Sequence, residues 1–374
     1  MGKVLLYAKI SGDLKTKIIS GEYGEGQRLP TEQELQAVYH VSRITVQKAM
    51  ETLAAEGLVT RIPGQGTFVK RAAPLTKAAP SVQKGGLIGL VMSGYDGACG
   101  NVFTEAVIVE ARQHGLYVVC GTNYTSQDEE TQIIRALLDN RVKGLIVMPV
   151  YDKFYNAEIL RQATGGFPMV FADRYLEGVP VPYVVSDNEM AAIKAVQHLS
   201  SLGHMNIALV SSLPTTTAIR QRSDGFYKSY TMVETPLQSR FVIDDIVCTM
   251  PGNDSCENRR ADIEKLKAFY REHPEVSGLV CINYPVLKLC EEAAAELGLR
   301  IPDDLSIVTF DTPEGQKDAA FYTHIRQDEK EMGMQAVRML CALLDGEQPN
   351  TQPPRILLQA QLCAGSSTKE VTLA

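Results

Sequence analysis

The sequence predicts an α/β protein in which an N-terminal winged helix-turn-helix precedes two doubly wound lobes. Apolar residues recur at helical spacing through residues 7–53 and are followed by two short strand-like runs. From Leu87 onward, near-continuous apolar runs alternate with amphipathic stretches, in two successive sets. Between these parts, Ala, Pro, Lys and Gly dominate and no apolar period persists. We therefore expect domains at 1–70 and 87–374, joined by an extended linker at 71–86.

Three helices are expected in the first domain. The first is defined by one apolar stripe, formed by Tyr7, Ile10, Leu14 and Ile18, and Gly21 stands where it would stop. Thr31 and Glu34 have the spacing of a capping box, which predicts a second short helix. Ser42 offers an N-cap for a third helix, whose apolar face is Val46, Ala49, Met50 and Leu53. The polar and cationic start of this helix suits contact with base edges in a major groove. The pattern by itself is equally consistent with a surface helical hairpin.

The segment after these helices predicts a β-hairpin wing. Gly57 would end the third helix, and strand-like residues 58–61 and 67–69 flank the turn Gly64-Gln65-Gly66. Here the chain resembles the winged-helix domain of GntR-family bacterial transcription regulators, over residues 5–70. The densest matches are Gly26-Gln-Arg28-Leu29-Pro30-Thr31-Glu32, Val41-Ser42-Arg43, Thr45-Val46 and Gly64-Gln-Gly66-Thr67-Phe68-Val69.

The resemblance implies that this domain binds double-stranded operator DNA. The residues expected to face the DNA are Arg28, Thr31, Ser42, Arg43, Thr45, Gln47, Lys48, Gln65 and Gly66. Many relatives carry Arg where this chain has Gln47. A glutamine amide pairs with adenine, so we expect a different base preference at that point.

Charge is distributed unevenly along the 374 residues, whose formal net charge is −7. Residues 1–71 hold ten Lys/Arg against seven Asp/Glu, whereas the remainder holds 27 against 37. A mildly basic head on an acidic body suits a protein that meets DNA at one end only. We see no signal peptide and no apolar run near the roughly 20 residues of a membrane span. We therefore expect a cytoplasmic protein that does not bind membranes.

The cysteines and histidines do not indicate a metal site. The eight cysteines are dispersed without a C-x-x-C pair, and the six histidines show no H-x-x-x-H spacing. We expect reduced thiols in the core, no metal and no cofactor.

The second domain is expected to contain two sets of alternating strands and helices. The first set has strands at 87–92, 117–120, 144–148 and 168–172, with helices near 102–113 and 129–140. The second has strands at 207–210, 241–243, 278–282 and 306–310, with helices near 189–201, 218–231, 257–272 and 285–297. Buried strands alternating with crossover helices form parallel sheets covered on both faces. A ligand is then expected at the carboxyl ends of the strands.

This domain is similar to the effector domain of the LacI family, which shares the periplasmic-binding-protein fold. The matching segments are Phe171-Ala-Asp173-Arg174, Val185-Ser-Asp187-Asn188, Ala195-Val-Gln-His198-Leu199, Arg220-Gln-Arg222, Cys281-Ile-Asn283, Phe310-Asp311 and Thr323-His-Ile-Arg-Gln327. The resemblance covers about residues 86–365. It implies that the chain crosses between lobes near residues 188, 312 and 326, with the first lobe formed by 86–188 and 312–326. A GntR-type head on a LacI-type body is the layout of arabinose-responsive repressors.

The resemblance also implies a ligand site between the lobes. The family's ligand-contact positions match Asp173, Arg222, Asn283, Asp311 and Gln327, whose carboxylate, amide and guanidinium groups suit a hydroxyl-rich ligand. Tyr95 and Phe103 follow the first strand and are candidates for stacking on the C–H face of a sugar. The alternatives are helix capping or pairing across the hinge for the polar residues, and core packing for Phe103. Tyr284 and Thr312 stand where relatives often carry Asp, which leaves the ligand open.

These observations predict an effector-controlled transcription regulator, a repressor that acts as a homodimer and binds a sugar or sugar derivative. The alternative is a sugar-acting enzyme with a fused DNA-binding head, in which Asp173 and Asp311 serve as acid and base. No Gly-x-Ser-x-Gly elbow, Walker A loop or G-x-G-x-x-G after the first strand supports that alternative.

Overall fold

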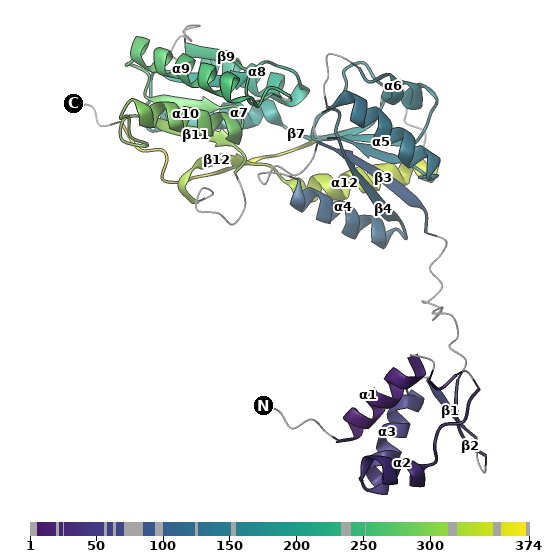
Figure 1. The fold of residues 1–374 in the computed structure, drawn as a ribbon. Coiled ribbons are helices and arrows are strands. Elements are labelled where there is room, and N and C mark those ends of the chain that lie inside the picture. The colour runs from purple at the N-terminus through teal and green to yellow at the C-terminus, as the bar shows by residue number, and fades with distance from the viewer. Residues whose placement is uncertain are drawn as a thin grey trace. The chain divides into compact units, whose positions relative to one another are not determined.

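The computed structural model divides the chain into two compact units, residues 1–82 and 83–374, here called the head and the body (Figure 1). It describes residues 6–19, 22–24, 26–55, 58–62, 65–70, 85–93, 100–123, 126–150, 155–232, 241–250, 252–312, 320–346 and 353–371. The predicted linker, except for Gly85 and Gly86, and the predicted stops Gly21 and Gly57 lie outside these residues. No helix in the described ranges combines the length and the apolar character that a membrane crossing requires.

The head contains the predicted three helices and a two-stranded wing. The helices are α1 (Leu6–Ile19), α2 (Glu32–Tyr39) and α3 (Arg43–Ala55), and the antiparallel strands are β1 (Val59–Ile62) and β2 (Gly66–Val69). The capping box is confirmed, because the Thr31 hydroxyl accepts from the Glu34 N–H at 3.3 Å and the Glu34 carboxylate accepts from the Thr31 N–H at 2.7 Å. The apolar stripes predicted for α1 and α3 meet in one buried core that includes Ile10, Leu14, Val46 and Leu53.

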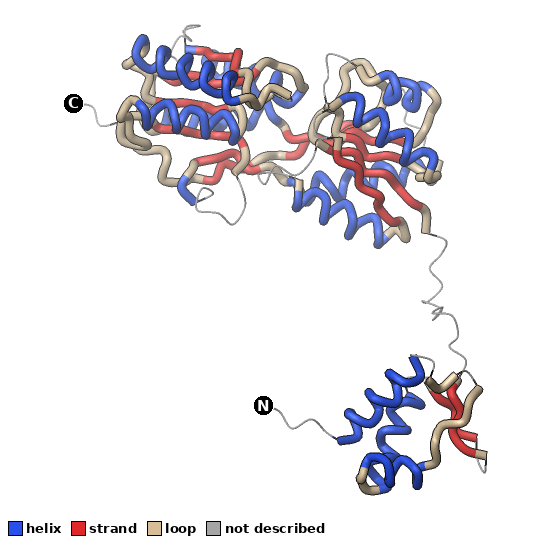
Figure 2. The backbone as a smooth tube through the Cα atoms, viewed as in Figure 1, coloured by secondary structure: helices blue, strands red, loops and turns tan. Residues whose placement is uncertain are grey.

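The first lobe of the body is a parallel six-stranded sheet in the order β13-β7-β6-β5-β3-β4. Its strands are β3 (Leu87–Met92), β4 (Tyr117–Thr122), β5 (Leu145–Val147), β6 (Met169–Ala172), β7 (Tyr183–Ser186) and β13 (Arg355–Leu358). Helices α4 (Asn101–Gln113) and α12 (Glu329–Leu344) cover one face, and α5 (Gln127–Asp139) and α6 (Ala157–Thr164) cover the other (Figure 2). Both faces are apolar, as expected for a sheet enclosed by helices.

The second lobe repeats this arrangement in the order β14-β12-β11-β10-β8-β9, with β14 antiparallel to β12. Its strands are β8 (Ile207–Ser212), β9 (Val242–Ile246), β10 (Gly278–Cys281), β11 (Ser306–Phe310), β12 (Thr323–Arg326) and β14 (Gln361–Cys363). Its helices include α7 (Asn188–Ser201), α8 (Thr217–Met232), α9 (Cys256–Glu272) and α10 (Tyr284–Glu296). All eight strands and six helices predicted for the body are present, within a few residues of the expected bounds.

The course of the chain between the lobes differs from the prediction. The crossing near residue 188 is confirmed, since β7 leads into α7. However, β12 pairs in parallel with β11. The described part of 312–326 therefore lies in the second lobe, and its assignment to the first lobe is wrong. The chain enters the first lobe after β12, as α12, and returns to the second lobe between β13 and β14.

The reason for this difference is burial. Tyr322 and Ile325 lie in the core of the second lobe. The apolar face of α12 packs on the first-lobe sheet through Met332, Ala336, Val337 and Leu340.

The seven cysteines in the described ranges are free thiols. Cys248, Cys281 and Cys290 are buried, in agreement with the expectation of core thiols. That expectation is wrong for Cys120 and Cys256, which are exposed.

Candidate functional site

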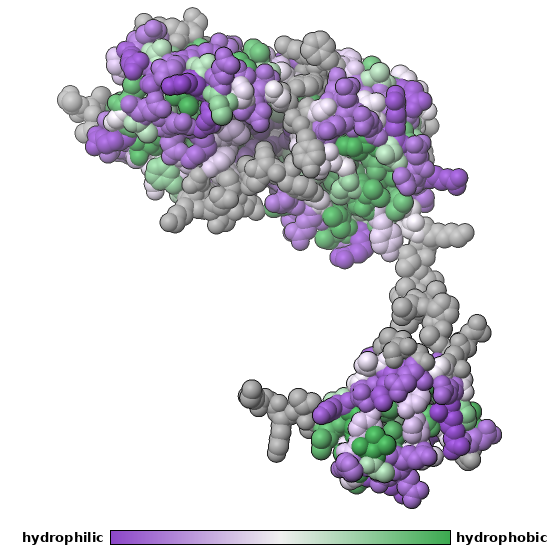
Figure 3. All heavy atoms as spheres, viewed as in Figure 1, coloured by the Kyte–Doolittle hydropathy of each residue, from purple (hydrophilic) through white to green (hydrophobic). Residues whose placement is uncertain are grey.

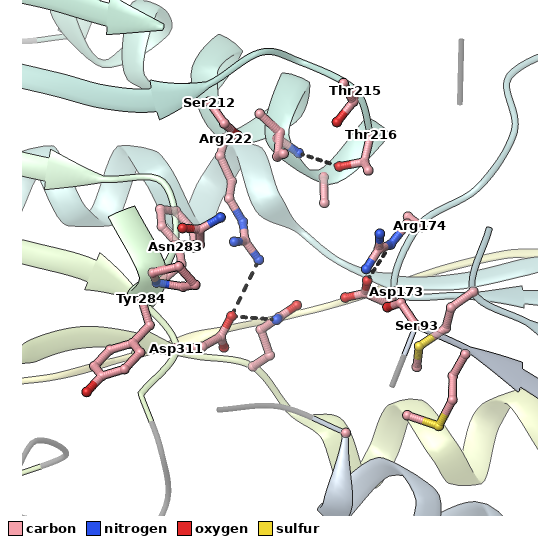
Figure 4. Close-up of a pocket in the computed structure, with 18 of the residues that line it drawn as sticks. Ser93, Asp173, Arg174, Ser212, Thr215, Thr216, Arg222, Asn283, Tyr284 and Asp311 are labelled. Carbon is pink, nitrogen blue, oxygen red and sulfur yellow. Dashed lines mark hydrogen bonds and ion pairs between the residues drawn. The ribbon is translucent and has the colours of Figure 1, made fainter. Parts of the chain in front are cut away.

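A cavity of about 320 Å³ lies between the two lobes, at the carboxyl ends of their strands (Figure 4). The first lobe contributes residues that follow β3, β5 and β6, together with the starts of α4 and α12. The second lobe contributes residues that follow β8, β9, β10 and β11, together with the start of α8. The cavity therefore occupies the position at which open parallel sheets bind ligands.

Arg222, from α8, lies at the second-lobe wall and is only 6% exposed. Its Nε donates to the Asn188 side-chain oxygen at 2.8 Å, and Nη1 donates to the Ile282 carbonyl at 2.9 Å. Its Nη2 lies 3.7 Å from the Asp311 carboxylate, and the guanidinium carbon lies 4.2 Å from the centre of the Phe310 ring. Protein groups alone therefore fix the guanidinium, and little side-chain entropy would be lost if it bound a ligand.

Two aspartates occupy equivalent points in the two lobes. Asp173 follows β6 and Asp311 follows β11, and both have a left-handed backbone, with φ of 64° and 60°. This conformation is costly for residues other than glycine and is often found at functional sites. Asp173 accepts from Arg174 Nε at 2.9 Å, and Asp311 accepts from Gln327 Nε2 at 2.9 Å. Each lobe thus presents a carboxylate held by a neighbouring donor.

Gln327 and Asn283 complete the polar wall. Gln327 lies where the chain crosses from β12 to α12, and its amide oxygen accepts from the Ser186 hydroxyl at 2.7 Å. Asn283 caps α10 by accepting from the Val286 N–H at 3.0 Å, and it also lines the cavity. Asn283 therefore caps a helix, which was one of the alternatives considered from the sequence, and also belongs to the site.

Both lobes contribute apolar residues to the wall, and those of the first lobe include three methionines and a phenylalanine. Met92, Met148, Phe103 and Met332 line it, and Phe103 is 1% exposed. Glu329 accepts from the N–H groups of Gly100 at 3.0 Å and Phe103 at 3.2 Å, at the amino end of α4. Its carboxylate thereby occupies the helix terminus that would otherwise attract an anion.

The head presents the start of α3 to solvent. Arg43 is 76% exposed and forms an ion pair with Glu32 at 3.6 Å. The hydroxyl groups of Ser42 and Thr45 hydrogen-bond to each other at 2.9 Å, and Gln47 donates to Glu51 at 3.4 Å. All of these groups can exchange their present partner for DNA at small cost, because exposed pairs contribute little.

Each of the other head residues predicted to face DNA has its own set of contacts. The Lys48 ammonium lies 4.6 Å from the centre of the Tyr7 ring. Arg28 pairs with Phe68 of the wing and lies against Gly66, whose φ is 122°. Thr31 has its hydroxyl engaged in the capping box, and Gln65 is exposed beside Gly66.

Comparison with known proteins agrees with this arrangement. Residues 6–69 match the family of bacterial regulatory proteins described as the gntR family, and residues 196–368 match the periplasmic binding protein-like domain. The chain combines a GntR-type head with a periplasmic-binding-protein-like body. It is a DNA-binding transcription regulator. The GntR-type head is the winged helix-turn-helix described above. The periplasmic-binding-protein-like body comprises the two lobes and the cavity between them.

Two relatives align with nearly the whole chain. The arabinose metabolism transcriptional repressors of Geobacillus stearothermophilus and Halalkalibacterium halodurans are 26% and 25% identical to it, and each alignment covers 98% of both chains. Among solved structures, the transcription regulator CcpA of Lactococcus lactis matches with a TM-score of 0.65 and 18% identity, over 76% of this chain and 100% of that one. A regulatory protein of the LacI family from Chloroflexus aggregans matches with a TM-score of 0.61 and 20% identity, over 75% of this chain and 98% of that one. These structures support the fold of the periplasmic-binding-protein-like body.

The structure brings six of the seven predicted ligand residues to one cavity: Phe103, Asp173, Arg222, Asn283, Asp311 and Gln327. Tyr95 lies outside the described residues. Sequence reasoning did not select Arg174, Ser212, Thr216, Thr249 or Glu329, which also line the cavity. A signal existed for Arg174, because it directly follows Asp173 in a segment that matches the family. No comparable signal marked Glu329, which reaches the cavity only because α12 returns to the first lobe.

Proposed function

We propose that this chain is a repressor whose affinity for operator DNA is controlled by an uncharged, hydroxyl-rich small molecule, a sugar or sugar derivative, bound in the cavity of the body. The observation that carries this proposal is the set of polar groups contributed by both lobes and by the crossover segment to one partly apolar cavity. Carboxylate, amide and guanidinium groups match the alternating donors and acceptors of hydroxyl groups, and the apolar wall suits C–H faces.

The charges of the cavity favour a neutral ligand over an anionic one. Arg174 is paired with Asp173, and Arg222 lies beside Asp311. The Glu329 carboxylate faces the amino end of α4. A phosphate or carboxylate on the ligand would therefore meet three carboxylates and two arginines that already have partners. Repulsion of this kind contributes to specificity as much as attraction does.

The polar network also connects the cavity to the segments on which the lobes move. Asp311 and Ser186 both hydrogen-bond to Gln327, and Arg222 reaches Asn188 at the start of α7. Ser186, Asn188 and Gln327 all lie where the chain crosses between lobes. A ligand that engages Arg222 and Asp311 would change the balance of these contacts and so bias the relative rotation of the lobes.

We assign operator recognition to the head residues predicted from the sequence, with the start of α3 in the major groove and the wing tip, at Gln65 and Gly66, approaching the minor groove. Since operators of such regulators consist of paired half-sites, we also propose that the chain acts as a homodimer.

An apolar patch on the first lobe, visible over α4 and β4, supports the proposed homodimer (Figure 3). Its exposed members are Leu87, Ile108, Val109, Tyr117 and Val119. A contiguous exposed patch of this kind next to an edge strand is typical of an interface.

A thermal-shift panel tests the effector. Neutral aldoses and polyols, their phosphates and the corresponding sugar acids are each added to the full-length protein. We expect a neutral member to raise the melting temperature and its phosphate to have no effect, since a ligand stabilises the state that binds it. Arg222→Ala and Arg222→Lys should abolish the shift and leave operator affinity within a few-fold.

Arg300→Ala provides the control for these variants. Arg300 is paired with Asp304 in the segment that precedes β11, at the opposite end of the strands from the cavity. This variant should keep the full thermal shift. Stabilisation by the phosphate but not by the neutral sugar would contradict the proposed ligand class.

A further inference from the structure

The exposed face of α3 contains one large apolar side chain. The exposed positions of α3 are Arg43, Ile44, Gln47, Lys48, Glu51 and Ala54. Ile44 is 77% exposed, the highest value for any large apolar side chain in the described part of the chain. Its β-branched neighbour Val46 is fully buried in the core of the head. Ile44 takes no part in that core.

The folding of the head does not account for this residue. An exposed isoleucine gains no burial, and its helix propensity is lower than that of alanine or of the long polar residues. Isolated exposed apolar residues are common on proteins. Ile44 differs from these in its position, because it lies between Arg43 and Thr45 at the start of the helix whose polar groups are proposed to meet base edges.

We propose that Ile44 reads the C5-methyl group of a thymine in the major groove of the operator. The thymine methyl is the apolar feature of that groove, and it distinguishes thymine from cytosine and from uracil. The proposal rests on the proposed function of the head and adds one base contact to it. Contact with the methyl group would bury the side chain that folding leaves in water.

The position of Ile44 on α3 also places the thymine relative to a second base. Ile44 and Gln47 are three residues apart, so they lie on one face of the helix, about 4.5 Å apart along its axis. Successive base pairs are about 3.4 Å apart. The two side chains therefore reach the same base pair or adjacent ones. A glutamine amide selects adenine, so the half-site should contain an adenine within one step of the thymine that contacts Ile44.

The test uses uracil, which differs from thymine only by the missing methyl group. An operator is first selected from a random duplex pool with the full-length protein. Each dT of one half-site is then replaced singly by dU, and affinities are measured by gel-shift titration. For the unmodified protein we expect one dT, next to the adenine position, at which the replacement weakens binding roughly fourfold, the effect of one buried methyl group.

Variants of Ile44 then assign this methyl contact to the side chain. Ile44→Ala should bind the thymine operator about as weakly as the unmodified protein binds the uracil operator, and should show no further loss with uracil. Ile44→Val retains the branched methyl groups and should remain sensitive. Leu6→Ala is the matched control, because Leu6 is 60% exposed on α1 and outside the proposed contact surface. It should leave the uracil profile unchanged.

The outcomes separate this inference from the proposed function. If an operator is selected but Ile44→Ala keeps the uracil sensitivity of the unmodified protein, the methyl contact is wrong and DNA binding by the head stands. If no sequence is enriched, the head reads no bases and both proposals are overturned. Loss of folding does not confuse the result, since Ile44 lies outside the core of the head and alanine is the better helix former.

Discussion

Two arginines show how differently one residue type is used in this protein. Arg222 is almost fully buried, and protein groups fix its position. Arg43 is 76% exposed and has a single ion pair, with Glu32 at 3.6 Å. Buried charges contribute only when their partners are retained, whereas exposed pairs exchange readily. The first arrangement suits a preformed site for a small molecule, and the second suits a side chain that reaches for DNA.

Arg43→Ala should weaken operator binding by roughly 1–3 kcal/mol if the guanidinium contacts a guanine. The stability of the head should change little, because the lost ion pair with Glu32 is exposed. Gel-shift titration at fixed salt measures the loss. Lys17→Ala, which removes a cation of α1 that is paired with Glu22, should bind normally. Unchanged affinity for Arg43→Ala would remove this residue from the interface.

At the scale of elements, hydrogen bonds join α5 and α6 to each other and to Val150, which follows β5. Asn156 caps α6 by accepting from the Glu158 N–H at 2.8 Å and donates to Glu130 of α5 at 2.9 Å. Glu130 also accepts from the N–H of Val150, a residue that lines the cavity. Glu130 therefore supports one wall of the site, whereas the buried Glu158 carboxylate accepts from Arg135, Arg161 and Gln162.

The two carboxyl groups should respond to pH in opposite ways. Burial raises the pKa of Glu158, but hydrogen bonds from Arg161, Gln162 and Arg135 outweigh it and lower the pKa to about 2. This group contributes stability that is complete above the ordinary glutamate pKa of about 4.3 and is lost as the pH falls toward 2. Burial raises the pKa of Glu130, and hydrogen bonds from Asn156 and Val150 only partly oppose this. The stability that Glu130 contributes is therefore lost as the pH rises through its raised pKa.

Glu158→Gln should lower the free energy of unfolding at pH 7 by roughly 1–2 kcal/mol, a value reduced because the arginine partners are exposed. The difference from the unmodified protein should disappear as the pH approaches 2. Glu130→Gln serves as the matched variant. Its stability relative to the unmodified protein should rise, not fall, between acid and neutral pH. Urea unfolding of the full chain across this range checks both, and parallel pH profiles would contradict the argument.

The sequence was informative where local chemistry determines structure. Thr31 and Glu34 predicted the capping box, and the apolar runs predicted eight strands, because these signals depend on neighbours in the chain. It was uninformative for β12, a four-residue strand with a histidine and an arginine, whose lobe is decided by pairing with β11. The ion pair between Arg222 and Asp311 was also out of reach, since these residues are far apart in the chain and meet only once the second lobe has formed.

For the whole molecule, the proposed dimer makes a prediction about the apolar patch on α4 and β4. Val109→Glu combined with Tyr117→Glu should convert the dimer to a monomer, because two charges would be buried in an interface without partners. Sedimentation of the full chain measures the mass. Met205→Glu is the control, since Met205 is 59% exposed on the second lobe. A double variant that remains dimeric would place the interface elsewhere.

The three crossings between the lobes are bound to one another. The Asp187 N–H donates to the Leu358 carbonyl at 2.8 Å, Gln359 donates to the Asp187 carboxylate at 3.1 Å, and Ser186 donates to Gln327 at 2.7 Å. A single connection would allow the lobes to turn in any direction. Three connections that are hydrogen-bonded to one another favour rotation of the lobes about one hinge line.

This restriction limits the conformational changes that the proposed effector could cause in the body. With one favoured rotation, two ligands of different shape that bind as proposed would not drive the body into two different active forms. They can differ only in how far they shift one equilibrium, so a poorer ligand would act as a partial inducer and not as a distinct signal. A series of related sugars would then give graded expression of the regulated genes through this single rotation.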